Sequence, residues 1–191
     1  MPTARRWADK DVKIVYCDDD QAYARGWLAR FIEASRQRPD EAICEQGADF
    51  ANRVSFRRKP RAIPNVGRGK DLTYRLKRTL SLGLLKPAIR NFRTDGYVDV
   101  MSGFGGVCVR PAFFPALAWQ IPDVLWTEDD FWLSGMMEVN GVGIWLNSKG
   151  PRPSSNKDAS NLSPLADINR TSNRRCLPYM QETFGIWPQA A

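Results

Sequence analysis

Residues 12–16, Val-Lys-Ile-Val-Tyr, are short, apolar and rich in β-branched side chains, and after one cysteine they meet three consecutive aspartates. This run predicts a buried strand that ends in acidic residues, namely Asp18, Asp19 and Asp20. Residues 22–37 follow with apolar side chains at helical spacing, which predicts an amphipathic helix. A strand, an acidic turn and a helix in this order are typical of α/β folds, which bind ligands where their strands end.

The rest of the chain alternates between strand and helix patterns. Extended segments are expected at 41–45, 97–101, 107–110 and 143–146, and helices at 111–119, 128–140 and 164–184. Thr127 suits the N-cap of the helix at 128–140, and Gly141 suits its end. We therefore expect an α/β fold with a mixed sheet flanked by helices, in a single domain that spans residues 1–191.

Positive charge is concentrated in one part of the sequence. Residues 53–93 contain 13 Lys or Arg and one acid, whereas the other residues contain 15 basic and 20 acidic side chains. Prolines and glycines are also frequent there, so we expect residues 48–93 to form a basic loop and helix excursion. Such a segment attracts phosphates, nucleic acid or acidic lipid headgroups, or its charges simply face solvent.

A dense basic cluster within this excursion is a candidate contact for an acidic membrane surface: Arg57, Arg58, Lys59 and Arg61. A nucleic-acid partner is disfavoured, because no helix-turn-helix, RNP or zinc-finger pattern is present. The sequence has neither an apolar run of membrane-spanning length nor a secretory signal at its start. We expect a cytoplasmic protein, peripheral to the inner face of a membrane if the basic cluster binds there.

The chain contains no histidine, so acid–base catalysis and metal binding must rely on carboxylates. The four cysteines are widely spaced, which predicts reduced thiols rather than a zinc site. Asp18 and Asp20 lie two residues apart, so in an extended chain they point to the same side and can hold a hard divalent cation. The alternative is that these acids only complement the dipole of the following helix.

A second acidic cluster, Glu128-Asp129-Asp130, lies at the start of a predicted helix. The helix dipole again offers a structural reason for acids there. The functional interpretation is a general base that takes a proton from an attacking hydroxyl. Between the two acidic clusters lies the segment 102–106, Ser-Gly-Phe-Gly-Gly, whose glycines either let a ligand approach the backbone or make a tight turn.

Taken in order, Asp-Asp-Asp at 18–20, Ser-Gly-Phe-Gly-Gly at 102–106 and Thr-Glu-Asp-Asp-Phe-Trp-Leu-Ser-Gly at 127–135 resemble the family 2-like GT-A glycosyltransferases. The resemblance covers roughly residues 12–146. It implies that Asp18 and Asp20 bind a metal and the donor diphosphate with Asp19 beside them, and that Gly105 and Gly106 form the acceptor-side turn. It also implies that Asp129 is the catalytic base, with Asp130 as the rival.

The implied reaction moves a sugar from a nucleotide-sugar to a hydroxyl of a glycan, a lipid-linked molecule or a protein. Mn²⁺ or Mg²⁺ would neutralise the leaving diphosphate. The basic segment is then a candidate lid over the donor. Two other hypotheses remain: a non-catalytic remnant that binds a sugar or a partner, and a metal-dependent phosphoryl hydrolase that uses the same acids.

The chain departs from the family pattern in two ways. Seventeen residues precede Asp18, whereas in the family a longer stretch with the first strands, which hold the nucleotide, comes before the D-x-D motif. We therefore expect a partial GT-A (Rossmann-like) fold without its N-terminal portion, as a fragment, a mis-assigned start or a degenerate copy, which leaves activity open. The absence of a Q-x-x-R-W motif disfavours the processive synthase branch.

Overall fold

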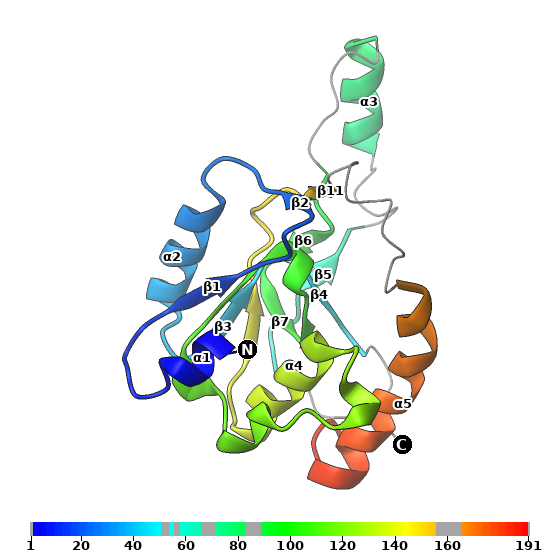
Figure 1. Ribbon diagram of the computed structural model, residues 1–191. Helices are drawn as coiled ribbons and strands as arrows, with labels where there is room; N and C mark the ends of the chain where they lie inside the picture. The colour runs from blue at the N-terminus through cyan, green and yellow to red at the C-terminus, as the bar shows by residue number, and fades with distance from the viewer. Residues whose placement is uncertain are drawn as a thin grey trace.

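A five-stranded sheet forms the centre of the protein (Figure 1). The computed structural model describes residues 2–50, 54–55, 58–65, 72–82, 89–155 and 166–190. In spatial order, the strands are β1 (Ile14–Tyr16), β9 (Val107–Val109), β3 (Ala42–Cys44), β10 (Ile144–Leu146) and β7 (Gly96–Val98). β3 and β10 are parallel, and all other neighbouring pairs in this sheet are antiparallel. The α/β class with a mixed sheet is confirmed.

Side chains alternate along each strand, so the sheet has two apolar faces. On one face Ile43, Cys108 and Trp145 pack against Phe31 of α2 (Trp27–Gln37). On the other face the neighbouring strand residues join a larger core with α4 (Asp129–Val139). Phe31 is fully buried, which stabilises the α2 layer by about 2 kcal/mol. The sheet therefore lies between two helical layers.

The other elements lie outside this central sheet and its two flanking helices. The remaining helices are α1 (Pro2–Arg6), α3 (Leu72–Leu80) and α5 (Ala166–Phe184), and 3₁₀ turns cover Gly103–Gly105, Pro111–Phe113, Ala116–Trp119 and Asp123–Leu125. Three two-stranded ladders complete the described fold: β2 (Gln21–Ala22) with β11 (Ser154–Ser155), β4 (Gly47–Ala48) with β8 (Val100–Met101), and β5 (Ile63–Pro64) with β6 (Phe92–Thr94). No described helix has the length and apolar character needed to cross a bilayer.

Several predicted elements are shorter than expected. The predicted helix at 22–37 begins only at Trp27, because the preceding residues pair with β11 or turn. The strand expected at 97–101 divides into β7 and β8, and a helix expected at 111–119 is two 3₁₀ turns. Pro115 explains this division, since the residue before a proline is driven out of helical geometry and Phe114 is extended.

The excursion expected at 48–93 is partly tied to the body of the protein. β4 pairs with β8, β5 pairs with β6, and Arg61 forms an isolated parallel bridge with Tyr97. Within the described part of this segment, α3 stands apart from the sheet layers (Figure 1). Among the described residues of this segment, α3 is the part that matches the expected excursion.

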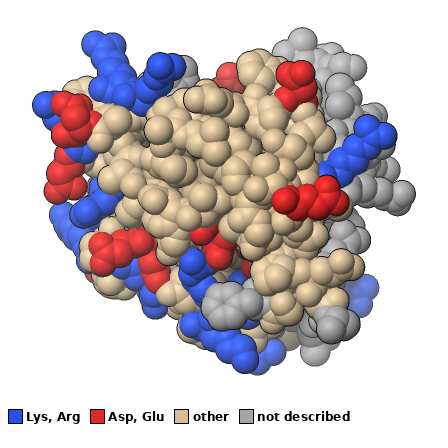
Figure 2. Space-filling model, turned by 90° about the horizontal axis from the view of Figure 1, so that it is seen from below, with Lys and Arg blue, Asp and Glu red and all other residues tan. Residues whose placement is uncertain are grey.

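The end of the molecule opposite α3 has few charges. Residues 111–122 contain no charged side chain and supply the exposed Leu117. Figure 2 shows this end as a continuous uncharged surface with Lys, Arg, Asp and Glu around its rim. At the side of the sheet, β1 is the last strand, and its outer edge has no strand partner among the described residues.

The turn before β9 packs tightly against α2. The Trp27 indole N–H donates a 3.0 Å hydrogen bond to the carbonyl oxygen of Gly105. A Cβ atom at Gly106 would lie 2.2 Å from the Trp27 ring, and a Cβ atom at Gly105 would lie 2.3 Å from Gln46 Cγ. Gly106 also has φ +90°, a conformation that residues with a side chain rarely adopt. Only glycine fits either position.

We predict that Gly106→Ala destabilises the protein far more than Gly141→Ala. Both glycines have positive φ, but no atom lies within 4 Å of the place where a Cβ would sit on Gly141. Gly141→Ala should lower the free energy of unfolding by about 1 kcal/mol, from backbone strain alone. Gly106→Ala should lower it by about 3 kcal/mol, because the methyl group also collides with Trp27. Urea unfolding followed by circular dichroism measures both, and equal losses would show that the Trp27 contact is unimportant.

Candidate active site

The antiparallel strand β9 brings the glycine turn to the edge where its neighbours end. Tyr16, the last residue of β1, pairs with Val107, and so does Cys44, the last residue of β3. Because Val107 is the first residue of β9, the turn at 102–106 lies beside the residues that follow β1 and β3. This edge is where open α/β sheets bind ligands.

Gly103 lies between the two acidic clusters. A Cβ atom placed on Gly103 would lie 3.1 Å from Asp18 Oδ1 and 3.2 Å from Asp130 Oδ1. The two carboxylate oxygens are therefore no further apart than the sum of these distances. The Gly103 N–H also donates a 2.8 Å hydrogen bond to Asp130 Oδ2. The structure thus joins the end of β1 to the start of α4, as the sequence prediction requires.

Further hydrogen bonds hold this arrangement. Ser134, one turn into α4, donates from Oγ to the carbonyl oxygen of Asp130 at 2.6 Å and accepts from the Met101 N–H at 3.0 Å. The Tyr23 hydroxyl lies 3.1 Å from the carbonyl oxygen of Asp18 and 3.2 Å from that of Phe104. α4, β8, the turn and the end of β1 are therefore fixed to one another at the site.

Both carboxylates have a raised pKa, and the charge of Asp18 contributes to the shift of Asp130. Burial raises the pKa of Asp130 to about 7, and the charges of Asp129 and Asp18 raise it too, against the lowering effect of the Gly103 N–H. Partial burial raises the pKa of Asp18, followed by the charges of Asp20, Asp129 and Asp19. Such shifts indicate that burial and neighbouring charges disfavour the ionised carboxylates, which lowers the stability of the fold. Carboxylates with perturbed pKa values are common at functional sites.

The other predicted acids surround this pair. Asp129 is exposed at the first position of α4, next to Asp130. Asp20 accepts a 3.0 Å hydrogen bond from the Gln21 side chain, and Asp19 is exposed beside it. Their charges reach Asp18, as its raised pKa indicates. All five predicted aspartates of the two clusters therefore contribute to one acidic region.

The glycines predicted to form the acceptor-side turn pack against other parts of the protein. On the side where a Cβ would lie, Gly105 faces Gln46 and Gly106 faces Trp27. Gly103, the first glycine of the same turn, is the one that faces the carboxylates. Sequence reasoning missed it because three glycines in five residues look equivalent until the strand register is known.

Glu128 differs from the aspartates that follow it. Thr127 was the expected N-cap of α4, but Glu128 occupies that position and makes no capping hydrogen bond through its side chain. Glu128 is 8% exposed, and its Oε1 has no hydrogen-bond partner among the described residues. Burial, followed by the charge of Asp129, raises its pKa. Glu128 points into the protein, so it is less suited than Asp129 to meet a substrate.

The donor chemistry of the site suits a hard divalent cation, since the facing groups are carboxylates. In the part of the chain that the structure describes, however, no three His, Cys, Asp or Glu side chains are grouped as a metal-ligand set. Mg²⁺ commonly binds through one or two carboxylates, with water and substrate phosphates completing its shell. The carboxylates present match that pattern of ligands.

Two of the four basic residues expected to meet a membrane or a donor have partners within the protein. Arg58 pairs with Glu138 of α4 and donates to the carbonyl oxygen of Gly141 at 3.2 Å. Arg61 lies 2.8 Å from Asp49 and 2.9 Å from Asp99. Lys59 is exposed, and Arg57 lies outside the described residues. Arg58 and Arg61 thus hold the segment to the body of the protein.

A scan against protein-family models finds no match to this chain, and a search of the curated proteins finds none either.

We predict that Asp130→Asn stabilises the fold at neutral and alkaline pH. The folded-state pKa of Asp130, about 7, lies above the ordinary value of 3.8, so its contribution to stability is present below pH 4 and is lost as the pH rises through 7. An asparagine keeps an acceptor for the Gly103 N–H and removes the repulsion with Asp18. The free energy of unfolding at pH 8 in EDTA should rise by roughly 1 kcal/mol or more, with little change at pH 4.

Thermal unfolding of wild-type protein and variant across this pH range measures the effect. Asp40→Asn is the matched control, because Asp40 lies exposed in the turn before β3. A stability gain that is the same at pH 4 and pH 8 would show that ionisation of Asp130 is not its cause.

Proposed function

We propose that the protein is a glycosyltransferase of the GT-A type, and that it transfers a sugar from a nucleotide-sugar to a hydroxyl acceptor. The observation that supports this most is the meeting of Asp18 and Asp130 at Gly103. The end of a strand and the start of a helix supply the two acids, which matches the D-x-D and E-D motifs of the resembled family. The order β1, β9, β3, β10 leaves β1 at the sheet edge, where the further strands of that fold would pair.

In this proposal the aspartates have different roles. Asp18 and Asp20 lie on the side of the donor diphosphate. Asp129 is the base that accepts the proton of the acceptor hydroxyl, because it is exposed at the first position of α4. Asp130 is a positioning residue, because its carboxylate accepts from the Gly103 N–H and faces Asp18.

A divalent cation fits the donor side of this site. Mg²⁺ or Mn²⁺, when bound there, would neutralise charge on the leaving diphosphate. Asp18 is the first candidate ligand, because burial and then the charges of the neighbouring aspartates raise its pKa, and a cation would offset that repulsion. Asp20 and Asp19 are the adjacent candidates.

Release of nucleoside diphosphate from UDP-, GDP-, dTDP- and CDP-sugars in the presence of Mn²⁺ tests the proposal. At least one donor should be turned over, and Asp18→Asn and Asp129→Asn should each slow the reaction by about 100-fold or more. Asp129→Asn should act on kcat with little change in KM for the donor, because it removes the base and leaves the donor side intact. Asp40→Asn should leave the rate unchanged.

Two results would contradict the proposal in different ways. Hydrolysis of p-nitrophenyl phosphate that depends on Asp18, without turnover of any nucleotide-sugar, would identify a phosphoryl hydrolase. Calorimetric titration that detects neither metal-dependent binding of nucleoside diphosphates nor turnover would identify a non-catalytic protein.

A further inference from the structure

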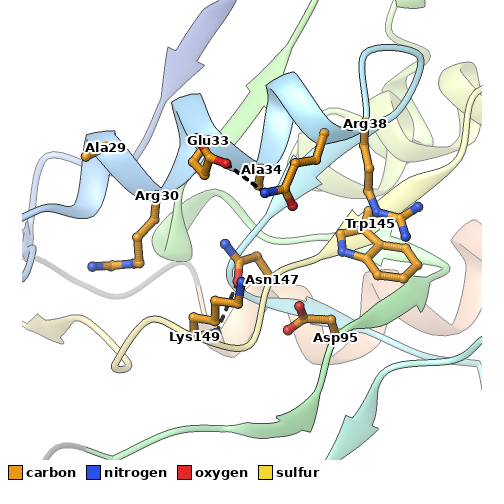
Figure 3. A pocket seen from close by; sticks show the side chains of 10 residues that line it. Ala29, Arg30, Glu33, Ala34, Arg38, Asp95, Trp145, Asn147 and Lys149 are labelled. Atoms are coloured by element: carbon orange, nitrogen blue, oxygen red, sulfur yellow. Dashed lines mark hydrogen bonds between the residues drawn. The ribbon is translucent and has the colours of Figure 1, made fainter.

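A second site lies on the opposite face of the sheet from the acidic pair. A pocket of about 370 Å³ is enclosed by α2 on one side and by the residues after β10 on the other (Figure 3). Tyr16, just before the acidic turn, packs with the core on the α4 face, whereas Trp145 in the pocket wall packs on the α2 face. The pocket is therefore separate from the carboxylate pair.

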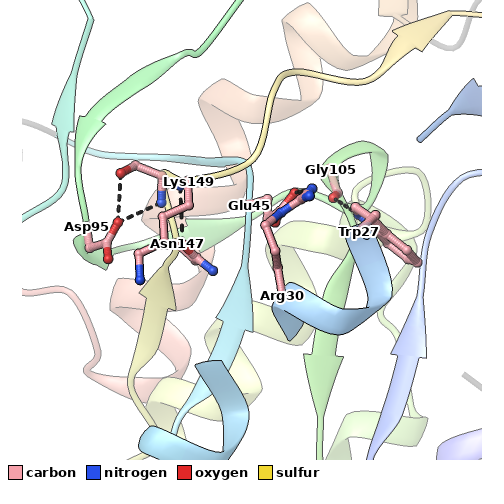
Figure 4. Close-up of polar contacts among 8 residues, drawn as sticks. Trp27, Arg30, Glu45, Asp95, Gly105, Asn147 and Lys149 are labelled. Atoms are coloured by element: carbon pink, nitrogen blue, oxygen red, sulfur yellow. Dashed lines mark hydrogen bonds and ion pairs between the residues drawn. The ribbon is translucent and has the colours of Figure 1, made fainter. Parts of the chain in front are cut away.

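The floor of the pocket is held firmly by hydrogen bonds. The Asn147 N–H donates to the carbonyl oxygen of Cys44 at 2.8 Å, and the Lys149 N–H donates to Asn147 Oδ1 at 3.2 Å. Asp95 Oδ1 accepts from both the N–H and the hydroxyl of Ser148, at 2.8 and 2.7 Å. Figure 4 shows the Lys149–Asn147 contact and the contacts of Asp95 beside β10. The pocket is preformed on this side.

A buried ion pair fixes the other wall. Arg30 of α2 contacts the Glu45 carboxylate through two nitrogens, at 2.6 and 2.9 Å, and the Glu45 side chain is 1% exposed (Figure 4). Gly150 lies against the same carboxylate, since a Cβ atom there would overlap Glu45 Oε2. The turn after β10 is thus locked to α2 through Glu45.

The charges that line the pocket are largely balanced. Arg30 is neutralised by Glu45, and Arg38 pairs with Glu41 at 2.8 Å while its guanidinium covers the Trp145 ring at 3.2 Å. Lys149 is the remaining cation, and the carboxylates of Asp95 and Glu33 also line the pocket (Figure 3). No net positive field favours a phosphate here.

Three polar groups point into the pocket with hydrogen-bonding capacity left. Asn147 uses its side-chain oxygen to accept the Lys149 N–H, and its amide nitrogen lies on the pocket side without a partner among the described residues. The Lys149 ammonium and the second oxygen of Asp95 likewise have no hydrogen-bond partner in the described chain. Figure 3 shows all three side chains across the pocket from α2. Together they offer two donors and one acceptor to a ligand in the pocket.

We propose that this pocket binds a neutral sugar unit, independently of the acidic pair. A sugar hydroxyl both donates and accepts, so neighbouring hydroxyls can accept from Asn147 Nδ2 and Lys149 Nζ and donate to Asp95. A phosphate or carboxylate can only accept, and it would meet the Asp95 charge. The polar lining also disfavours an apolar ligand, which needs mostly hydrophobic walls.

Titration with the methyl glycosides of glucose, galactose, mannose and N-acetylglucosamine, followed by ¹H–¹⁵N NMR, tests this site. With at least one of them, the Asn147 side-chain amide signals should shift and saturate at millimolar concentration. Lys149→Met and Asp95→Asn should weaken that binding by at least tenfold. Asp95→Asn keeps an acceptor for Ser148, so the floor of the pocket should stay folded.

Lys10→Met is the matched control, because Lys10 pairs with Asp9 in an exposed turn, and it should bind as the wild type does. The absence of saturable shifts for all four glycosides would overturn the proposal, as would shifts at Asn147 with inorganic phosphate alone. Asp18→Asn separates this site from the proposed activity, since it should abolish transfer and leave the glycoside shifts unchanged. Loss of those shifts in Asp18→Asn would show that the pocket is not an independent site.

Discussion

The position of β9 between β1 and β3 is the constraint on which the acidic site depends. Because β9 runs opposite to both neighbours, it begins where they end, and Val107 pairs with the last residue of each. A parallel strand in this place would have put its glycine turn at the other end of the sheet. The antiparallel direction therefore delivers Gly103 to Asp18, and α4, fixed to β8 by Ser134, delivers Asp130 to the same point.

Because Gly103 has no side chain, the carboxylates of Asp18 and Asp130 can both lie close to its α-carbon. A side chain there would occupy the space between the carboxylates, and the Gly103 N–H supplies one of the few favourable contacts that Asp130 has. The fold bears this repulsion because the surrounding core is large, with α4 almost wholly buried from Phe131 to Met137. Retaining a costly arrangement of this kind is typical of sites kept for chemistry rather than for stability.

Much of the fold follows from short-range pattern. The sequence runs that form β1, β3 and β10 are apolar and bounded by turn residues. α4 ends at Val139, two residues before Gly141, the predicted stop, which has a positive φ. The predicted helix boundaries were wrong where tertiary contacts decide the local structure. α2, for example, starts at Trp27 instead of residue 22, because β2 pairs with β11. The basic segment was predicted to be an excursion because its composition does not indicate that Arg61 pairs with Asp49 and Asp99.

The two acidic clusters could also be predicted as site candidates from the sequence. Each lies at the end of a predicted strand or the start of a predicted helix, and carboxylates favour metal binding or acid–base catalysis. Their convergence was a hypothesis from family resemblance, because no local pattern states which strand lies beside β1. The roles of the three glycines could not be separated without the register that places Gly105 and Gly106 against Gln46 and Trp27. The pocket could not be predicted for a related reason: it depends on how α2 packs beside Asn147 and Lys149, which follow β10.

Helix α2 links the two candidate sites physically. Near its start, Trp27 packs on the glycine turn that leads into Gly103, and one turn later Arg30 holds Glu45 at the wall of the pocket. Ring contacts of Trp27 with Tyr23 and Phe31 stiffen this stretch, and Tyr23 also reaches the carbonyl oxygen of Asp18. A shift of α2 would therefore disturb both sites, although their ligand-facing groups lie on opposite faces of the sheet. The sheet lies between the ligand-facing groups of the two sites, whereas α2 contacts residues of both.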